Sequence, residues 1–239
     1  MVKDLSQEIL RARRKAAEEA LKNLIKTGFD LIGIGSGSTV KLFLSIIPQD
    51  LLRNKCFVST SYDTTLALKE LGARCVITDM PPEEIDIAID SADEIDLSGN
   101  LLKGGGGALF REKIVLLSAR SRVIIADEEK LVERLGKRGS VPIEIAVYAY
   151  NYVKRRIEGL GLELKLRSSE GKLGPVISDN GNILADVILK SSAEDLLKLN
   201  SVLKSIDGVI ATGIFPYENY KILIGRLSGE VICLLNNCD

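Results

Sequence analysis

DSADEIDLSGNLLKGGGGALFREK (residues 90–113) connects a predicted strand to a predicted helix. In the strand, residues 85–89, three isoleucines alternate with Asp86 and Ala88, which is the period of a β-strand. The helix begins directly after the glycine run, at ALFREK. Asp90 therefore follows the carboxyl end of a strand, and open α/β sheets bind their ligands at that edge.

Residues Gly104 to Gly107 form a run of four glycines directly after Lys103. Without Cβ atoms the backbone of this run can approach a ligand closely, and the following helix points its first N–H groups at the same place. Glu112 lies in the first turn of that helix. A carboxylate base, an ammonium group and backbone donors are the groups that proton transfer at carbon needs. Roles without chemistry also stay open, in which Lys103 is a surface lysine and Glu112 interacts only with the helix dipole.

The composition excludes several classes of function. The chain has 239 residues and a net charge of −1, so no global field attracts nucleic acid or an anionic membrane. It contains no histidine, which excludes a Ser-His-Asp hydrolase, a Cys-His protease and a His-ligated metal. The sequence shows no signal-peptide core and no apolar run long enough to cross a membrane, so we expect a cytoplasmic protein.

The four cysteines form no CxxC pair, which argues against a zinc or redox motif. We expect three buried thiols and one thiol near the end of the chain. Cys56 and Cys75 both lie in predicted strands, and whether they bond stays open.

Strand and helix alternate through the first half of the chain, which predicts a Rossmann-like α/β fold with a parallel-rich sheet between two helix layers. A long helix is expected at residues 5–27, and a further helix should run from an Asp127 cap to near Gly136. The predicted strands cover residues 30–35, 56–60, 74–78, 85–89 and 123–126.

Near Gly139 the pattern becomes strand, helix, strand, strand, helix, strand, which predicts a small ferredoxin-like (split βαβ) domain. We expect a catalytic domain of residues 1–138 plus 209–239, and an inserted α+β domain of residues 139–208 that contributes oligomer contacts. The inserted elements are strand 142–150, helix 151–159, strand 162–167, a hairpin around the turn DNG, helix 193–206 and a strand near Val209.

GIGSGST (residues 33–39) joins a strand to a helix but matches neither common nucleotide motif. Ser38 occupies the third glycine position of the dinucleotide fingerprint, and no Gly-Lys-Ser/Thr closes a P-loop. The motif favours an anion site, most simply for a phosphate, although a tight turn with a Ser/Thr cap stays open. The hydroxyl residues among positions 59–65 either line the same crevice or cap the next helix.

The acids Asp90, Asp93 and Asp96 leave three interpretations open. They could bind a divalent cation, form a solvated turn, or accept hydrogen bonds from a polyhydroxylated substrate. Lys130 follows the fifth strand, where it either faces the ligand edge or is an ordinary surface lysine.

Over nearly its whole length the chain resembles the ribose-5-phosphate isomerase A family. The resemblance rests on motifs in a fixed order, and DSADE followed by KGGGGAL and REK is the most specific of them. The other matching motifs are GIGSGST, TSYDTTLALKELG, VIIADEEKLVERLG, VPIEI, SDNGNILADV and GVIATGIF.

The resemblance implies an aldose–ketose isomerase of the non-oxidative pentose phosphate pathway that interconverts ribose 5-phosphate and ribulose 5-phosphate. It implies no metal, no organic cofactor, and a homodimer or homotetramer. Glu112 would move the proton between C1 and C2, Lys103 would steady the enediolate, and Asp90 and Asp93 would handle hydroxyl protons and ring opening. Arg14 or Lys15 would assist. The implied substrate contacts are Ser36, Gly37, Ser38, Thr39, Asp90, Ser91, Ala92, Asp93, Lys103, Gly104, Gly105, Gly106 and Lys130.

The chain departs from the family pattern at three positions. Ser91 replaces a usual glycine and would be strained if that position needs a positive φ. Phe110 stands where the family often has threonine, and Ser36 replaces a common threonine but keeps the hydroxyl. Two other classes of protein with a similar fold are open alternatives, a sugar-phosphate-sensing effector module and a coenzyme-A transferase.

Overall fold

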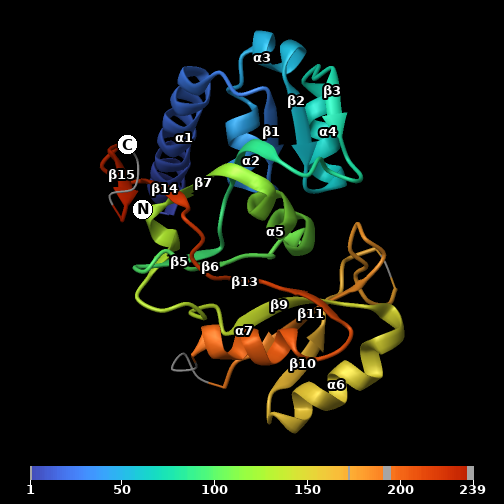
Figure 1. Ribbon diagram of the computed structural model, residues 1–239. Coiled ribbons are helices and arrows are strands. Elements are labelled where there is room, and N and C mark those ends of the chain that lie inside the picture. The colour runs from blue at the N-terminus through green and yellow to red at the C-terminus, as the bar shows by residue number, and fades with distance from the viewer. Residues whose placement is uncertain (1, 172, 191–194, 236–239) are drawn as a thin grey trace. The chain divides into compact units, whose positions relative to one another are not determined.

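The computed structural model describes residues 2–171, 173–190 and 195–235 (Figure 1). The chain divides into two compact units. Unit 1 comprises Met1–Ala92, Arg111–Leu131 and Tyr217–Asp239, and unit 2 comprises Asp93–Phe110 and Val132–Pro216. The segment predicted as an insertion, residues 139–208, lies within unit 2, which also takes in the glycine run.

Unit 1 is built on a seven-stranded sheet with the order β15-β14-β7-β4-β1-β2-β3. All neighbouring strands pair in parallel except β15, which is antiparallel to β14. The predicted parallel-rich α/β fold is therefore confirmed. The strands are β1 Leu31–Ile34, β2 Cys56–Ser59, β3 Cys75–Ile77, β4 Ile85–Asp90, β7 Ala119–Asp127, β14 Lys221–Gly225 and β15 Val231–Leu234.

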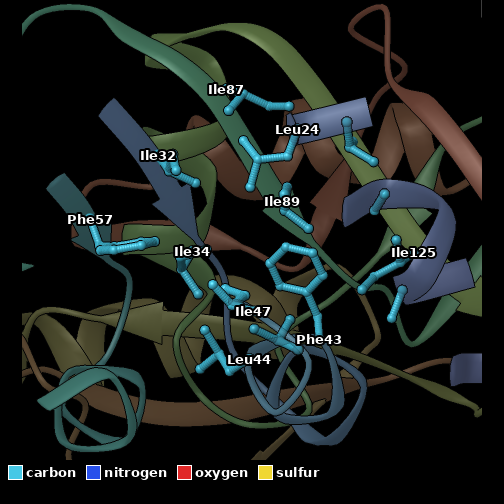
Figure 2. Packing of buried hydrophobic residues seen from close by; sticks show 14 of the residues in the cluster. Leu24, Ile32, Ile34, Phe43, Leu44, Ile47, Phe57, Ile87, Ile89 and Ile125 are labelled. Atoms are coloured by element: carbon cyan, nitrogen blue, oxygen red, sulfur yellow. The ribbon is translucent and has the colours of Figure 1, made fainter. Parts of the chain in front are cut away.

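Helices cover both faces of this sheet because its central strands are apolar on both sides. On one face Phe43 and Leu44 pack against Ile32, Ile34 and isoleucines of β4 (Figure 2). On the other face Val115 of α5 approaches β1 so closely that a Cβ atom on Gly33 would lie 2.5 Å from its Cγ1. The helices are α1 Val2–Thr27, α2 Ser38–Leu44, α3 Gln49–Asn54, α4 Tyr62–Glu70 and α5 Leu109–Ser118.

Unit 2 contains a four-stranded antiparallel sheet with the order β10-β11-β9-β12, which is the split βαβ arrangement expected. Its helices share one face, where Val153 of α6 and Leu203 of α7 pack with Ile143. The elements are β9 Ser140–Ile145, α6 Tyr150–Gly159, β10 Glu163–Leu166, β11 Ile183–Ile188, α7 Leu196–Lys204 and β12 Val209–Thr212. The start of the predicted helix 193–206 lies outside the described residues.

A second, smaller sheet was not predicted. Its order is β13-β6-β5-β8, and its strands are two or three residues long. Such short pairs carry too little hydrophobic periodicity to be recognised in a sequence. They are β5 Glu94–Asp96, β6 Leu101–Leu102, β8 Leu131–Val132 and β13 Ile214–Phe215.

Two predicted elements are wrong in extent. The helix expected from Asp127 to near Gly136 is a single 3-10 turn, η1 Glu128–Lys130, although Asp127 does cap it by accepting from the backbone N–H of Glu129. The strand expected at 142–150 ends at Ile145, and the chain continues as a second 3-10 turn, η2 Val147–Ala149.

The expectation of free thiols is wrong for Cys56, Cys75 and Cys233, because each of these described cysteines is disulfide-bonded. Cys56 and Cys75 are register partners on the parallel strands β2 and β3, with Cα atoms 4.7 Å apart, and they form a disulfide. Cys75 is exposed, and Cys56 is half-buried. Among the residues that the structure describes, no helix is long and apolar enough to cross a membrane.

Candidate active site

In unit 1 the loop of residues 35–39 connects β1 to α2 at the carboxyl edge of the sheet. Gly37 has a φ of 105° and caps α2 through its backbone. The Ser36 hydroxyl donates to Ser61 Oγ at 2.7 Å and lies 2.9 Å from Thr60 Oγ1. Ser61 also caps α4 by accepting from the N–H of Thr64. The hydroxyl cluster thus caps a helix, one of the two roles left open by the sequence, and it also forms hydrogen bonds with the loop of residues 35–39.

Asp90, the last residue of β4, is 1% exposed and lies against this loop. Its Oδ1 accepts from the N–H of Ser91 at 2.7 Å and of Ser36 at 3.4 Å. The carboxylate therefore lies at the carboxyl edge of the sheet, where the strand pattern placed it. Ser91 is not among the described residues with a positive φ, so it carries no left-handed strain.

Glu112 lies in the first turn of α5 and is 5% exposed. It shares a helix face with Val115, which is one turn later and contacts the middle of β1 at Gly33. Because a helix that covers a parallel sheet runs antiparallel to its strands, the turn that carries Glu112 faces the carboxyl end of β1. The structure thus places a buried carboxylate at the edge that carries Asp90.

Arg13 of α1 reaches the loop, a contact that was not predicted from the sequence. Its Nε donates to the fully buried Asp127 at 2.7 Å, and its Nη1 lies 3.5 Å from Ser38 Oγ. Asp127 in turn caps η1, the turn that carries Lys130. The Arg13–Asp127 ion pair and the Arg13–Ser38 contact therefore link α1, the loop of residues 35–39 and the turn of Lys130.

The helical phase of α1 explains why Arg13 and not its neighbours takes this role. Arg13 precedes Ala17, Ala20 and Leu24 at helical spacing, and all three are buried. Arg14 and Lys15, which the resemblance suggested, instead form ion pairs with Glu18. In the sequence, the spacing of Arg13 from Ala17, Ala20 and Leu24 was the signal that could have placed Arg13 on the buried face of the helix.

In unit 2 the glycine run forms a turn in which the N–H of Gly107 donates to the carbonyl of Gly104 at 3.0 Å. Gly104 and Gly107 have positive φ values of 96° and 85°. Asp93 accepts from the N–H of Gly105 at 2.8 Å, and Arg138 donates to the same carboxylate at 2.9 Å. Asp93 and the glycine run therefore form one hydrogen-bonded structure.

Lys103, directly before the glycine run, is only 2% exposed, so the surface interpretation is wrong. Its ammonium group lies 5.7 Å from the centre of the Phe215 ring, and its backbone N–H donates to Gly213 at 2.8 Å. A buried ammonium group is costly unless other groups compensate its charge. Its burial therefore favours a role in binding or catalysis over a surface role.

The other acids of the DSADEID motif have structural roles. Glu94 is 2% exposed and accepts from three consecutive N–H groups, those of residues 136–138. Asp96 accepts from the N–H groups of Ser98 and Asn100 and closes its own turn. Among the described residues, no group of three or more acidic or thiol side chains could hold a metal ion.

The chain is similar to known proteins over most of its length. The profile of the family described as ribose 5-phosphate isomerase A (phosphoriboisomerase A) matches residues 56–229. Ribose-5-phosphate isomerase A of Archaeoglobus fulgidus is 43% identical over 218 residues, which are 89% of this chain and 94% of that protein. Ribose-5-phosphate isomerase of Dictyostelium discoideum is 39% identical over 91% of this chain and 94% of its own.

Solved structures of proteins with similar names also match this chain over nearly its whole length. Ribose 5-phosphate isomerase A of Methanocaldococcus jannaschii matches with a TM-score of 0.80 and 34% identity, over 93% of this chain and 98% of that one. A D-ribose-5-phosphate isomerase in complex with phospho-erythronic acid matches with a TM-score of 0.82 and 33% identity, over 95% and 98% of the two chains.

Proposed function

Because the chain belongs to the ribose 5-phosphate isomerase A family, we propose that it interconverts ribose 5-phosphate and ribulose 5-phosphate with Glu112 as the catalytic base. The observation that carries this assignment is the buried carboxylate in the first turn of α5. The chain has no histidine, so an acidic residue is the natural group to accept a proton from carbon near neutral pH. The reaction belongs to the non-oxidative pentose phosphate pathway.

Glu112 takes the proton from C2 of the open-chain aldose and returns it to C1, so that an enediolate is the intermediate. The hydroxyl proton on O2 passes to O1 in the same conversion, and we assign its handling to Asp90 and Asp93. The negative charge that develops on the oxygens of the enediolate needs a cation and hydrogen-bond donors held in place beforehand. We assign these roles to the ammonium group of Lys103 and to backbone N–H groups of the glycine run, Gly104 to Gly106. Their burial and fixed turn support the assignment.

Asp90 and Asp93 are proposed to accept hydrogen bonds from substrate hydroxyls, with ring opening assisted by one of them. Each carboxylate is already fixed by backbone N–H donors, which keeps its orientation constant during the reaction. Ser91 and Ala92, which connect them along the chain, would contribute backbone contacts.

The phosphate is proposed to bind the loop Ser36 to Thr39 together with Lys130. The loop supports this assignment because it places flexible backbone, hydroxyl groups and the start of α2 at one point. Arg13 orders the loop through Ser38 and adds positive charge near it. No metal or organic cofactor takes part in the proposed reaction.

The decisive experiment is a coupled assay of ribulose 5-phosphate formation in the presence of EDTA. Glu112→Gln keeps the size of the side chain but cannot accept the proton, so turnover should fall by about 10² to 10⁴-fold while substrate binding remains. Glu133→Gln, which alters an exposed carboxylate, is the matched control. A Glu112→Gln enzyme within a few-fold of the unmodified enzyme would remove Glu112 from this role.

We further propose a homodimer or homotetramer that uses unit 2, including the insertion 139–208. An exposed apolar patch supports this, formed by Val147, Tyr148 and Ile210 with exposed fractions of 54%, 104% and 41%. The chain segments that carry these residues are next to each other, because the N–H of Ala146, just before Val147, donates to the carbonyl of Gly208, just before β12. Contiguous apolar surface of this kind is common at protein interfaces. A cytoplasmic location, and no nucleic-acid or membrane partner, complete the proposal.

A further inference from the structure

The guanidinium group of Arg167 lies against the carbonyl side of the glycine run. Its Nη1 donates to the carbonyl of Gly104 at 2.7 Å and to that of Gly105 at 3.3 Å. The other two nitrogens form a bidentate pair with Asp186 at 2.8 and 2.7 Å. Both side chains are largely buried, with 17% and 23% of their surface exposed. All four residues belong to unit 2.

The sheet of unit 2 explains why Asp186 holds Arg167 at this place. Asp186 pairs with Pro142 across β11 and β9, so the two side chains share a face of the sheet. The glycine run covers the same face, because a Cβ atom on Gly104 would lie 3.0 Å from Pro142. The helices α6 and α7 pack on the opposite face. Asp186 thus fixes Arg167 between the sheet and the loop.

The two carbonyl contacts determine where the amide groups of the loop point. In a planar trans peptide the C=O and N–H bonds point in opposite directions. The Gly104 carbonyl faces Arg167, and the N–H of the same peptide, that of Gly105, indeed donates to Asp93 on the other side. The Gly105 carbonyl also faces Arg167, so the N–H of Gly106 points to the side that carries Asp93.

A turn made only of glycines does not hold this orientation by itself. The central peptide of a β-turn can rotate by about 180° between the type I and type II forms, and glycine is compatible with both. The structure has positive φ values at Gly104 and Gly107 but not at the central residues, as in a type I turn. A cation that binds both carbonyls stabilises this form over the flipped one.

We propose that Arg167, held by Asp186, is a positioning residue of the isomerase: it aims the N–H groups of the glycine run at the oxygens of the enediolate. The inference rests on the proposed function, in which these N–H groups stabilise the intermediate. Arg167 acts from the carbonyl side and touches no reacting atom. Losing one preorganised donor to an oxyanion typically lowers kcat by about 10² to 10³-fold, which sets the scale of the expected effect.

Three variants separate positioning from simple stabilisation. Arg167→Lys keeps the charge, but a single ammonium group cannot bind Asp186 in a bidentate manner and reach two carbonyls as well. Asp186→Asn keeps the volume and releases the guanidinium. Both should lower kcat by at least about tenfold with a smaller change in KM, because the proposed phosphate contacts are made by other residues. Lys165→Met is the control, since Lys165 is an exposed cation beside the same cavity.

Chemical rescue supplies a test that a purely structural role would fail. A cavity of about 580 Å³ lies beside Arg167 and is lined by residues that include Gly105, Lys165 and Asp186. In Arg167→Ala, added guanidinium ion, below the molar concentrations that unfold proteins, should occupy the vacated place and restore kcat at least about tenfold. Methylammonium, which lacks the planar fork, should not.

The outcomes are distinct. An unmodified protein without isomerase activity would refute the proposed function itself. An active enzyme whose Arg167→Lys and Asp186→Asn variants keep kcat within a few-fold of the Lys165→Met control would overturn the positioning role alone. A loss of kcat in Arg167→Ala that follows thermal stability and does not respond to guanidinium would also overturn it. If Arg167→Ala does not fold, the kcat and KM values of the other two variants decide.

Discussion

Gly35 and Asp90 are in direct contact: a Cβ atom on Gly35 would lie 1.9 Å from the Oδ1 atom of Asp90. The carboxylate therefore occupies the space that any side chain at position 35 would need. Because Gly35 begins the loop of residues 35–39 and Asp90 ends β4, this contact couples the proposed phosphate site to a proposed catalytic acid.

Gly35→Ala should displace the Asp90 carboxylate or separate the loop from β4. Overpacking of this kind costs about 1–3 kcal/mol of unfolding free energy, and the displaced acid should lower turnover by at least about tenfold. The measurements are a thermal unfolding curve and the coupled assay. Gly159→Ala is the control, because no atom outside the chain neighbours and the local backbone of α6 would lie within 4 Å of the added methyl group. Equal behaviour of the two variants would contradict the importance of the contact.

Arg13→Gln should raise the KM for ribose 5-phosphate by about tenfold, because it removes the positive charge beside the proposed phosphate loop. A hydrogen bond to a charged group is worth roughly 1.5–3 kcal/mol. The substitution should also lower thermal stability, since Asp127 is fully buried and loses its cationic partner. Arg14→Gln removes only an exposed pair with Glu18 and is the control. A larger KM effect in Arg14→Gln would return the role to the residue that the resemblance suggested.

Asp86 gives the fold a pH dependence. Backbone N–H groups of Leu31 and then Asp30 donate to its carboxylate and hold the pKa of Asp86 below its usual value. A depressed pKa stabilises the folded chain above the unfolded-state pKa of about 3.9, and this contribution is lost as the pH falls through the folded-state pKa. Asp86→Asn should therefore cost about 1–2 kcal/mol at pH 7.

Urea unfolding at a series of pH values tests this role of Asp86. The stability difference between the unmodified protein and Asp86→Asn should shrink progressively below about pH 4. Asp207→Asn, at an exposed position, should show no such difference at any pH. A difference of constant size down to pH 2 would mean that the charge of Asp86 is not its source.

The Cys56–Cys75 disulfide should stabilise the sheet edge. It closes a loop with a sequence separation of 19 residues, and a loop of this size is typically worth about 2–4 kcal/mol. Reductant should therefore lower the Tm of the unmodified protein by more than that of Cys75→Ser, whose Tm should already be low and which still contains the disulfide of Cys233. A Tm that responds equally to reductant in both proteins would place the effect elsewhere.

Tyr148→Glu should weaken self-association by placing a charge in the apolar patch of unit 2. Light scattering coupled to gel filtration gives the mass of the assembly directly. Leu66→Glu changes an exposed apolar residue of α4, outside that patch, and should leave the mass unchanged. An unchanged mass for Tyr148→Glu and a reduced one for Leu66→Glu would move the interface to unit 1.

The sequence predicted those parts of the fold that local patterns determine. The strand of residues 85–89 was recognisable because its three isoleucines alternate with Asp86 and Ala88, and its end correctly located Asp90 at the carboxyl edge of the sheet. The cap at Asp127 was correct as well, but the helix expected after it is absent. The N–H groups of residues 136–138 bind Glu94, more than forty residues earlier, and no local pattern announces such a contact.

Site residues whose roles depend on contacts with residues far away in the sequence were not predicted, for the same reason. Arg167 looks like any cation at the end of a strand until Asp186 and the carbonyls of Gly104 and Gly105 are placed around it. Arg138 on Asp93 is a similar case. The sequence identified residue types that can perform the chemistry, whereas their supporting contacts required coordinates.

The position of β14 in the large sheet bears on how the chain folds during synthesis. This strand pairs with β7, although it leaves the ribosome long after β1, β2 and β4, and β15 follows it in the chain. Until β14 emerges, one side of β7 remains an open edge that other nascent chains could pair with. Folding of this sheet is thus completed late in translation, and shielding by a chaperone would matter most in the interval before β14 appears.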